Sequence, residues 1–160
     1  RICSQIYRKI LAPEALRGSG GVLVNSSGER FVNELDLRSV VSKAILTHCD
    51  RYVSGNYTGP PFAYCILSKE SQELFGFPAL GFYKDKMGLF EECRDVSAVA
   101  TLIGCKEEVL IETLRSYSNA SKIGNCPHTK KNIFPADVSP ESTDLIVGRI
   151  TPSSKFLLVI

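Results

Sequence analysis

The chain has 160 residues, 44% of them hydrophobic and 22% charged, which is typical of one globular domain with a sizeable core. Its formal net charge of +2 is too small to indicate nucleic acid or an anionic membrane as a partner. No apolar run approaches the roughly 20 residues that a membrane-spanning helix needs. The first residue is Arg1 rather than Met, and no signal peptide follows it. We therefore expect a fragment of a soluble intracellular protein, with the cytosol, a mitochondrion and a glycosome-like organelle all open as its compartment.

Six cysteines are scattered through the chain, and their spacing argues against a metal site. No two of them form a C-x-x-C pair, and only His48 and His128 are available as further zinc ligands, so we predict no bound metal. Cysteines distributed in this way are typical of a reducing compartment, where they pack as small hydrophobic side chains. Their even number leaves disulfide bonds open.

Residues 20–34 have the pattern of a β-hairpin. Residues 22–24 form an apolar, β-branched run, and residues 25–28, Asn-Ser-Ser-Gly, have the composition of a turn. The next four residues alternate polar and apolar side chains, as a returning strand does. In the simplest pairing, Val24 lies opposite Glu29.

A helix is predicted directly after the hairpin. From Leu37 to Tyr52, apolar residues recur at the spacing of one buried helical face, and Asp36 is placed to cap the first turn. Arg38 then falls in that first turn, where the helix dipole disfavours a cation by about 0.3–1 kcal/mol at exposed sites. Its position indicates a role other than helix stability, although a surface ion pair would explain it as well.

Further helices and strands follow without βαβ regularity, so the predicted fold class is α+β. The expected strands are 62–67 and 89–93. The expected helices are 69–74, capped by Ser68, 98–103, capped by Ser97 and ended by Gly104, and 106–119. Glycine and proline are frequent in the remaining segments, so residues 55–61, residues 76–88 and most of the chain after Gly124 are expected to be loop or irregular.

The predicted turn brings one carboxylate and two guanidinium groups to the same end of the hairpin. Extending the pairing places Arg17 near Asp36, and Glu14 lies one helical turn before Arg17. Glu14, Arg17 and Arg38 therefore form a candidate site that could hold an anion and pass a proton. The glycines within residues 18–21 would let a flat ligand approach the backbone. A cluster of surface salt bridges fits the same spacing.

The residues around this site resemble the succinate dehydrogenase/fumarate reductase flavoprotein family. The family pattern is Glu-x-x-Arg-Gly, a stretch of small residues, a strand ending in Asn, then Gly-x-Arg-Phe and an arginine that opens a helix. Residues 12–38 match this pattern with both arginine spacings. The match is similar above all to soluble, single-subunit fumarate reductases of the kinetoplastid NADH-dependent type. Weaker matches, from Gly104 to Asn119 and over residues 147–152, extend the resemblance to residues 11–152.

The resemblance implies an FAD-dependent oxidoreductase that reduces fumarate to succinate, with NADH as electron donor of the full-length protein. In the family, FAD passes a hydride to fumarate held between a flavin domain and a mobile capping domain. The resemblance makes Arg38 the proton donor to the other alkene carbon and makes Arg17 and Glu14 its resupply, with Glu14 and Arg38 also binding substrate. A cation there stabilises carbanion-like charge. Because arginine normally stays protonated, the proton must return quickly through Glu14.

The resemblance also implies a division of the chain. Residues 1–34 would be a partial FAD-domain segment with the β-hairpin, residues 35–147 the capping, or substrate-clamp, domain, and residues 148–160 the start of the return to the FAD domain, ending in a tail unlike the family. The sequence contains no G-x-G-x-x-G motif. We therefore expect FAD to be bound mainly by parts outside this chain, and the isolated chain to be inactive.

Three features depart from the family pattern. Pro13 replaces a Thr that binds substrate in many members, and Arg1 stands where a substrate-binding His is expected. Residues 153–160 lack the His and Gly-Gly that the family carries there, and neither His48 nor His128 is placed to substitute. Two alternatives stay open: a flavoprotein acting on succinate, aspartate or a 3-oxosteroid, and an inactive truncated product.

Overall fold

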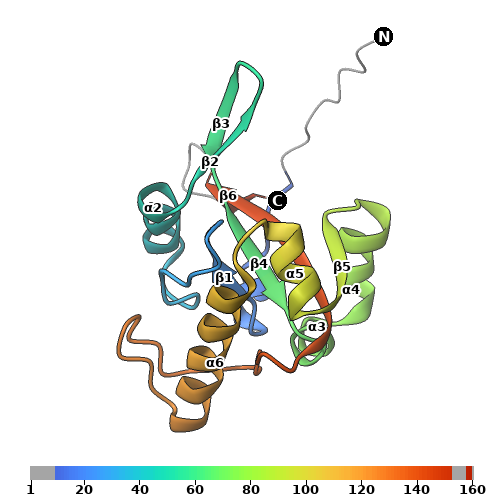
Figure 1. Cartoon of the computed structure of the whole chain (residues 1–160). Coiled ribbons are helices and arrows are strands. Elements are labelled where there is room, and N and C mark those ends of the chain that lie inside the picture. Colours follow the sequence, from blue (N-terminus) through green and yellow to red (C-terminus); the bar gives the residue numbers. More distant parts are fainter. Residues whose placement is uncertain (1–9, 153–157, 160) are drawn as a thin grey trace.

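An antiparallel sheet with the strand order β1-β4-β6-β5 forms the centre of the computed structural model, which describes residues 10–152 and 158–159 (Figure 1). Its strands are β1 (Val22–Val24), β4 (Ala63–Leu67), β5 (Phe90–Asp95) and β6 (Thr143–Pro152), and β7 (Leu158–Val159) pairs with the end of β6. Helices and antiparallel strands are mixed without parallel crossovers, which confirms the predicted α+β class.

Helices cover both faces of this sheet. They are α1 (Glu14–Gly18), α2 (Arg38–His48), α3 (Lys69–Phe75), α4 (Phe77–Gly81), the π-helix η1 (Phe82–Lys86), α5 (Val96–Ile103) and α6 (Glu107–Ile123). Because successive side chains of a strand point to opposite faces, the strands contribute to two separate cores. Val22 and Ile66 pack with α5 and α6, whereas Leu23 and Cys65 pack with α1, α2 and α4.

The predicted strand at 62–67, the helix capped by Ser68 and the helix ended by Gly104 are confirmed. The helix predicted at 106–119 forms but continues to Ile123, and both Gly104 and Gly124 adopt positive φ after their helices. Two N-caps differ from the prediction. The carboxylate of Asp95, rather than Ser97, accepts the Ala98 N–H and begins α5.

The N-terminal boundary of α2 also differs from the prediction. The N-cap of α2 is Leu37, which makes no side-chain bond to the helix. Asp36 cannot serve as the cap because its Oδ1 accepts the N–H of its direct neighbour, Leu37, at 2.7 Å. Arg38 is thus the first residue of the helix, at the end where an arginine was predicted to be unfavourable.

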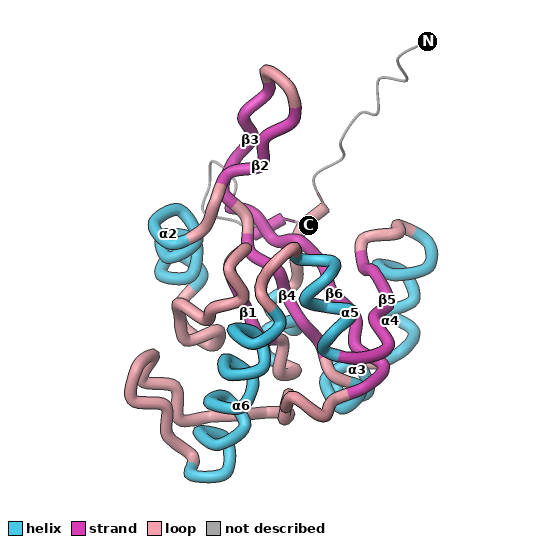
Figure 2. Tube along the Cα trace, in the orientation of Figure 1, coloured by secondary structure: helices cyan, strands magenta, loops and turns pink. Residues whose placement is uncertain are grey.

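A two-stranded hairpin of β2 (Arg51–Ser54) and β3 (Tyr57–Pro61) projects from the body of the molecule (Figures 1 and 2). The predictions of a helix reaching Tyr52 and of a loop at 55–61 were therefore wrong. The helix ends at His48 because Cys49 has extended backbone angles, and the apolar residues of β2 stay exposed instead of continuing a buried face.

The longest strand, β6, was predicted to be loop and instead lies between β4 and β5 in the sheet. Its apolar run from Leu145 to Val147 is buried on both faces, so it lacks the alternation that marks a half-exposed strand. Pro152 is tolerated because it is the last residue of the strand. The region 76–88, predicted to be irregular, contains α4 and η1.

The turn at residues 25–28 is confirmed, but the returning strand of the predicted hairpin is not formed. Gly28 has φ +82° and donates to the Asn25 carbonyl at 3.0 Å, and the Asn25 side chain accepts the Glu29 N–H at 3.0 Å. Beyond the turn there is a single bridge, Val24 to Arg30, one residue out of the predicted register. β1 pairs along its length with β4, and the chain after Arg30 leaves the sheet and buries the Glu34 side chain.

β6 spans the predicted boundary at 147/148 within one sheet, and the division into FAD-domain and capping segments stays a prediction. Arg1, Cys3 and most of the 153–160 tail lie outside the described residues. The other five cysteines are all free thiols. Across the ranges that the structure describes, no helix has both the length and the apolarity to cross a lipid bilayer.

Candidate functional site

A cavity of about 280 Å³ lies between α1 and the start of α2, and all three predicted site residues line it. Glu14 opens α1, Arg17 lies one turn later, and Arg38 opens α2. The remaining lining residues are Gly18 and the segment 34–37. The sequence therefore predicted this grouping correctly, although α1 and the segment 34–37 create it rather than a long hairpin.

Arg38 and Glu14 form an ion pair at the mouth of this cavity. Nε and Nη2 of Arg38 lie 3.0 and 2.8 Å from Glu14 Oε1. The two side chains keep 36% and 60% of their surface exposed, and exposed pairs of this kind contribute about 0–1 kcal/mol to stability. The pair therefore does little for the fold, and it leaves a guanidinium and a carboxylate accessible to a ligand.

Arg17 is held in a different way, because it is 5% exposed and bonds to main-chain oxygens. Its Nη1 donates to the carbonyls of Glu34, at 2.5 Å, and Asp36, at 3.1 Å. Burial lowers the pKa of the Arg17 guanidinium, the Glu14 carboxylate opposes that change, and the Arg38 cation adds to it. Arg17 thus gives up a proton more readily than an exposed arginine does.

The glycines beside Arg17 have different roles. A Cβ at Gly20 would lie 2.7 Å from the Cβ of Ala136, and one at Gly21 would lie 2.6 Å from the Leu16 carbonyl, so both positions serve internal packing. A Cβ at Gly18 would meet nothing within 4 Å. Gly18 lines the cavity and has open space beside it, whereas Gly20 and Gly21 are closely packed. Entry of a flat ligand beside Gly18 stays a prediction.

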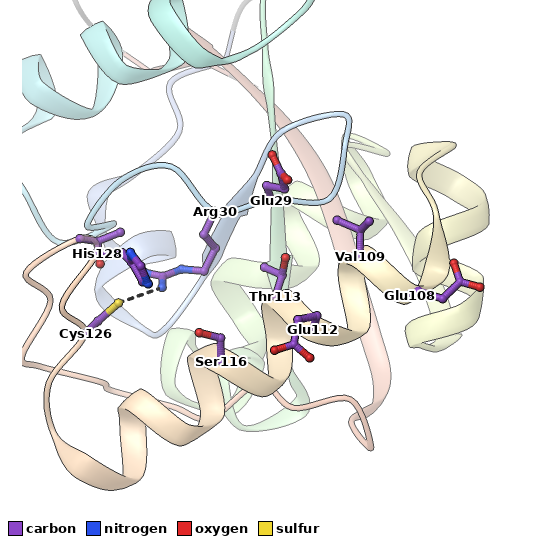
Figure 3. Close-up of a pocket in the computed structure, with 10 residues that line it drawn as sticks. Glu29, Arg30, Glu108, Val109, Glu112, Thr113, Ser116, Cys126 and His128 are labelled. Carbon is purple, nitrogen blue, oxygen red and sulfur yellow. Dashed lines mark hydrogen bonds between the residues drawn. The ribbon is translucent and has the colours of Figure 1, made fainter.

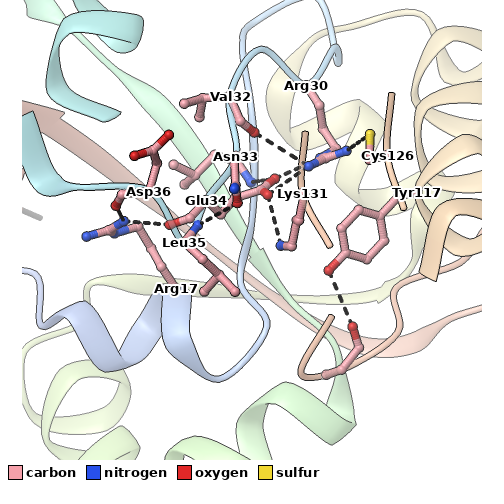
Figure 4. A network of polar contacts seen from close by, with 12 residues as sticks. Arg17, Arg30, Val32, Asn33, Glu34, Leu35, Asp36, Tyr117, Cys126 and Lys131 are labelled. Carbon is pink, nitrogen blue, oxygen red and sulfur yellow. Dashed lines mark hydrogen bonds and ion pairs between the residues drawn. The ribbon is translucent and has the colours of Figure 1, made fainter. Parts of the chain in front are cut away.

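A buried network of charged side chains lies beside this cavity and was not predicted (Figure 4). Its centre is the carboxylate of Glu34, which is fully buried. Glu34 accepts from Arg30 Nε at 2.7 Å and Nη2 at 2.8 Å, and from Lys131 Nζ at 2.9 Å. The ring of Tyr117 lies under both cations, with its centre 4.8 Å from Arg30 Cζ and 5.1 Å from Lys131 Nζ.

The sequence indicated only the Arg30–Glu34 contact of this network. Arg30 and Glu34 are four residues apart within the resembling segment, and that spacing suggests a pair. Lys131 lies in the loop after α6, 97 residues from Glu34, and no local pattern connects the two.

A larger hollow of about 560 Å³ lies along α6 on the other side of Arg30 (Figure 3). Its lining includes Cys126, whose Sγ accepts from Arg30 Nη1 at 3.7 Å, and His128 on the neighbouring loop. Burial opposes ionisation of the Cys126 thiol, but bonds from Thr129 and Arg30 outweigh it and lower the thiol pKa. His48, by contrast, is exposed on α2, with its ring centre 6.1 Å from that of Phe31.

Two known proteins with sequences related to most of this chain are yeast fumarate reductases that extend well beyond it. The fumarate reductase of Schizosaccharomyces pombe is 31% identical over 145 residues, which cover 90% of this chain and 25% of that protein. Fumarate reductase 1 of Saccharomyces cerevisiae is 31% identical over 152 residues, covering 94% of this chain and 31% of that protein. The chain therefore spans a quarter to a third of the length of these relatives.

Two solved structures show the same fold at lower sequence identity. The open conformation of a flavocytochrome c3 fumarate reductase matches with a TM-score of 0.69 and 22% identity, over 88% of this chain and 23% of that chain. A solution structure of a fumarate reductase flavoprotein subunit from Lactobacillus plantarum matches with a TM-score of 0.59 and 17% identity, over 90% of this chain and 91% of that chain.

One protein family matches this chain along almost the whole length of the chain. The match to the FAD binding domain family extends over residues 3–156. With the two yeast relatives, it shows that the chain belongs to the FAD-binding flavoprotein oxidoreductases of the succinate dehydrogenase/fumarate reductase family.

Proposed function

We propose that this chain is the proton-delivery part of an FAD-dependent fumarate reductase, with Arg38 as the proton donor. The observation that supports it most strongly is the ion pair of Arg38 with Glu14 beside the buried Arg17, in one cavity. In a surface salt-bridge cluster, the third charge would face solvent. Here Arg17 is buried and bonded, and the other two groups stay accessible.

We assign each of the three side chains a role according to its burial and its hydrogen-bond partners. When bound and reduced, the flavin would supply the hydride that reaches one alkene carbon of fumarate. The accessible guanidinium of Arg38 binds a substrate carboxylate and stabilises the negative charge that develops on the other carbon. Arg38 then transfers a proton from its guanidinium to that carbon, and the new C–H bond completes succinate.

Neutral arginine is a strong base, so Arg38 must recover its proton at once. Glu14, whose Oε1 lies 2.8 Å from Arg38 Nη2, can pass a proton to it once its own carboxylate has been protonated. We assign Arg17, whose pKa burial lowers, to protonate Glu14 through an intervening water, since its Nη1 bonds to main-chain carbonyls and not to Glu14. Arg17 then takes its own proton back from solvent. The order of transfer is thus from Arg17 to Glu14 to Arg38 to substrate.

The charges of the cavity also bear on the choice of substrate. The cavity is lined by two arginines and three acidic residues, so its net charge does not select the substrate. The accessible Arg38 guanidinium is the group that favours a carboxylate-bearing substrate such as fumarate over a neutral 3-oxosteroid. Pro13 offers no hydroxyl for a substrate hydrogen bond, so Arg38 and Glu14 are the side chains we assign to substrate binding. NADH as electron donor and residues 1–34 and 148–160 as FAD-domain segments stay predictions.

The test uses the full-length flavoprotein that contains this segment. Arg38→Gln removes the proton donor but keeps a polar side chain, and we expect fumarate turnover to fall by about 10²- to 10⁴-fold. Arg115→Gln is the matched control, because Arg115 forms an exposed ion pair with Glu112 at the same 2.8 Å. Parental turnover in Arg38→Gln would refute the assignment.

A further inference from the structure

The position of Arg17 depends on the main chain of residues 34–36. Its guanidinium reaches no side-chain carboxylate among the bonds of the described residues, and it donates instead to the Glu34 and Asp36 carbonyls. Any shift of that main chain therefore moves the acceptors of Arg17. A proton relay is sensitive to such shifts, because displacement by about 1 Å can cost about 10²-fold in rate.

The segment that carries these carbonyls belongs to no helix or strand. Its firmest attachment is the side chain of Glu34, which points away from Arg17 into the core (Figure 4). Besides the two bonds from Arg30, the carboxylate accepts the Leu23 N–H of β1 at 3.3 Å. Glu34 thus fixes the segment to the central sheet on one side while its carbonyl holds Arg17 on the other.

Lys131 is the long-range contact of this carboxylate. Its Nζ lies 2.9 Å from Glu34 Oε2, and both side chains have no exposed surface. The loop around Lys131 is itself held, because its carbonyl accepts the Cys126 N–H at 2.7 Å. The ring of Phe134 lies 5.5 Å from Nζ. Lys131 therefore connects the loop after α6 to the segment beside the cavity.

Charge balance argues that Lys131 is not needed to neutralise Glu34. The Arg30–Glu34 pair is neutral by itself, and Lys131 adds a buried positive charge whose desolvation is unfavourable. Apolar groups of similar volume often replace buried ions without loss of stability, so a buried lysine is poor evidence for a stabilising role. Positional specificity explains its presence better.

We propose that Lys131 is a positioning residue for Arg17, acting through the Glu34 side chain and the carbonyls of residues 34 and 36. The geometric part of this inference stands on the contacts alone. Its catalytic consequence rests on the proposed function, in which Arg17 resupplies the proton.

The geometric part is tested on the 160-residue chain by NMR of the arginine side chains. The Arg17 signals are identified by their loss in Arg17→Lys, and their hydrogen exchange and Cζ–Nη rotation are measured. Lys131→Met keeps the length of the side chain but removes the cation and its bond to Glu34. We expect Arg17 hydrogen exchange to become about 10-fold faster or more, because the acceptors of Arg17 open locally.

Two controls separate this effect from a general loss of stability. Lys84→Met removes a lysine that pairs with Glu92 at the sheet edge, and Val99→Ala removes buried methyl groups of α5. Both should leave Arg17 exchange at the parental rate. Parental exchange in a folded Lys131→Met would overturn the proposal. If Lys131→Met does not fold, Glu34→Asp gives the same test, since it keeps every charge and shortens the reach of the carboxylate.

The catalytic consequence is measured in the full-length flavoprotein. We expect Lys131→Met to lower kcat by about 10-fold or more at nearly unchanged KM, since Lys131 lies outside the cavity and a misplaced relay slows the transfer step. Unchanged kcat, with Arg38→Gln inactive, would refute the role of Lys131 in catalysis and leave the proposed function standing. Parental turnover in Arg38→Gln would instead refute the proposed function, while the NMR result would still decide the geometry.

Discussion

Glu34 is the residue whose protonation should affect the stability of the fold most. Burial alone would raise its pKa, but the hydrogen bonds and charge of Arg30, together with the charge of Lys131, outweigh burial and hold the pKa below its ordinary value of 4.5. A carboxyl group with a lowered folded-state pKa stabilises the fold above its unfolded pKa. That stabilisation is lost as the pH falls through the folded-state pKa.

We therefore expect the free energy of unfolding, measured by urea denaturation, to fall at acid pH more steeply in the parent than in Glu34→Gln. At neutral pH, Glu34→Gln should cost about 3–5 kcal/mol, because it leaves two buried cations without a counter-charge. Glu112→Gln, which removes an exposed carboxylate, should cost less than about 0.5 kcal/mol. Parallel pH curves for the parent and Glu34→Gln would contradict this account.

The sequence predicted the grouping of Glu14, Arg17 and Arg38 because all three lie within 25 residues of chain around one turn. Local turn chemistry is sufficient there, even though the expected strand register was wrong by one residue. The contact of Glu34 with Lys131 could not be predicted from local sequence, because only the tertiary fold brings together two positions 97 residues apart. Spacing along the sequence therefore indicates contacts between residues close in the chain, including the buried Arg17, and misses the distant Lys131.

Among the elements, β6 determines the sheet because it pairs with both β4 and β5. Gly148 lies at its centre, opposite Phe90 of β5 and Cys65 of β4. A Cβ at this position would lie 2.7 Å from the Phe90 ring and 3.2 Å from the Leu89 carbonyl. A glycine is thus required where the Phe90 ring crosses the strand.

Gly148→Ala should lower the free energy of unfolding by about 1–3 kcal/mol, as overpacking a core does. Gly18→Ala is the matched control, because a Cβ there meets nothing within 4 Å, and it should change stability by less than about 0.5 kcal/mol. Both values come from chemical denaturation. Equal stability of the two variants would mean that the ring of Phe90 does not lie over Gly148.

Elements with their own end signals were predicted well from the sequence, and elements without them were not. Ser68 begins α3 and Gly104 ends α5 as expected, because a capping hydroxyl and a positive φ are local requirements. β6 has no such signal. Its burial on both faces depends on α5, β4 and β5, which lie far from it in sequence. The local sequence pattern therefore predicted a loop instead of a strand.

At the scale of the whole molecule, the described residues form a sheet with two cores, yet the chain contains no G-x-G-x-x-G motif and spans at most 31% of the two yeast relatives. The chain should therefore fold cooperatively by itself without retaining FAD. After incubation with FAD and desalting, we expect no flavin absorbance with the 160-residue chain and no fumarate-dependent oxidation of a reduced dye. Flavin retained at one equivalent per chain would contradict this prediction.

The proposed delivery by Arg38 of the proton that completes succinate is tested most directly by the reoxidation of reduced flavin by fumarate. In stopped-flow experiments with the full-length flavoprotein, Arg38→Gln should retain its FAD and slow this single step by about 10²-fold or more. Arg115→Gln should react at the parental rate. Reoxidation by fumarate at the parental rate in Arg38→Gln, with flavin content unchanged, would contradict the account.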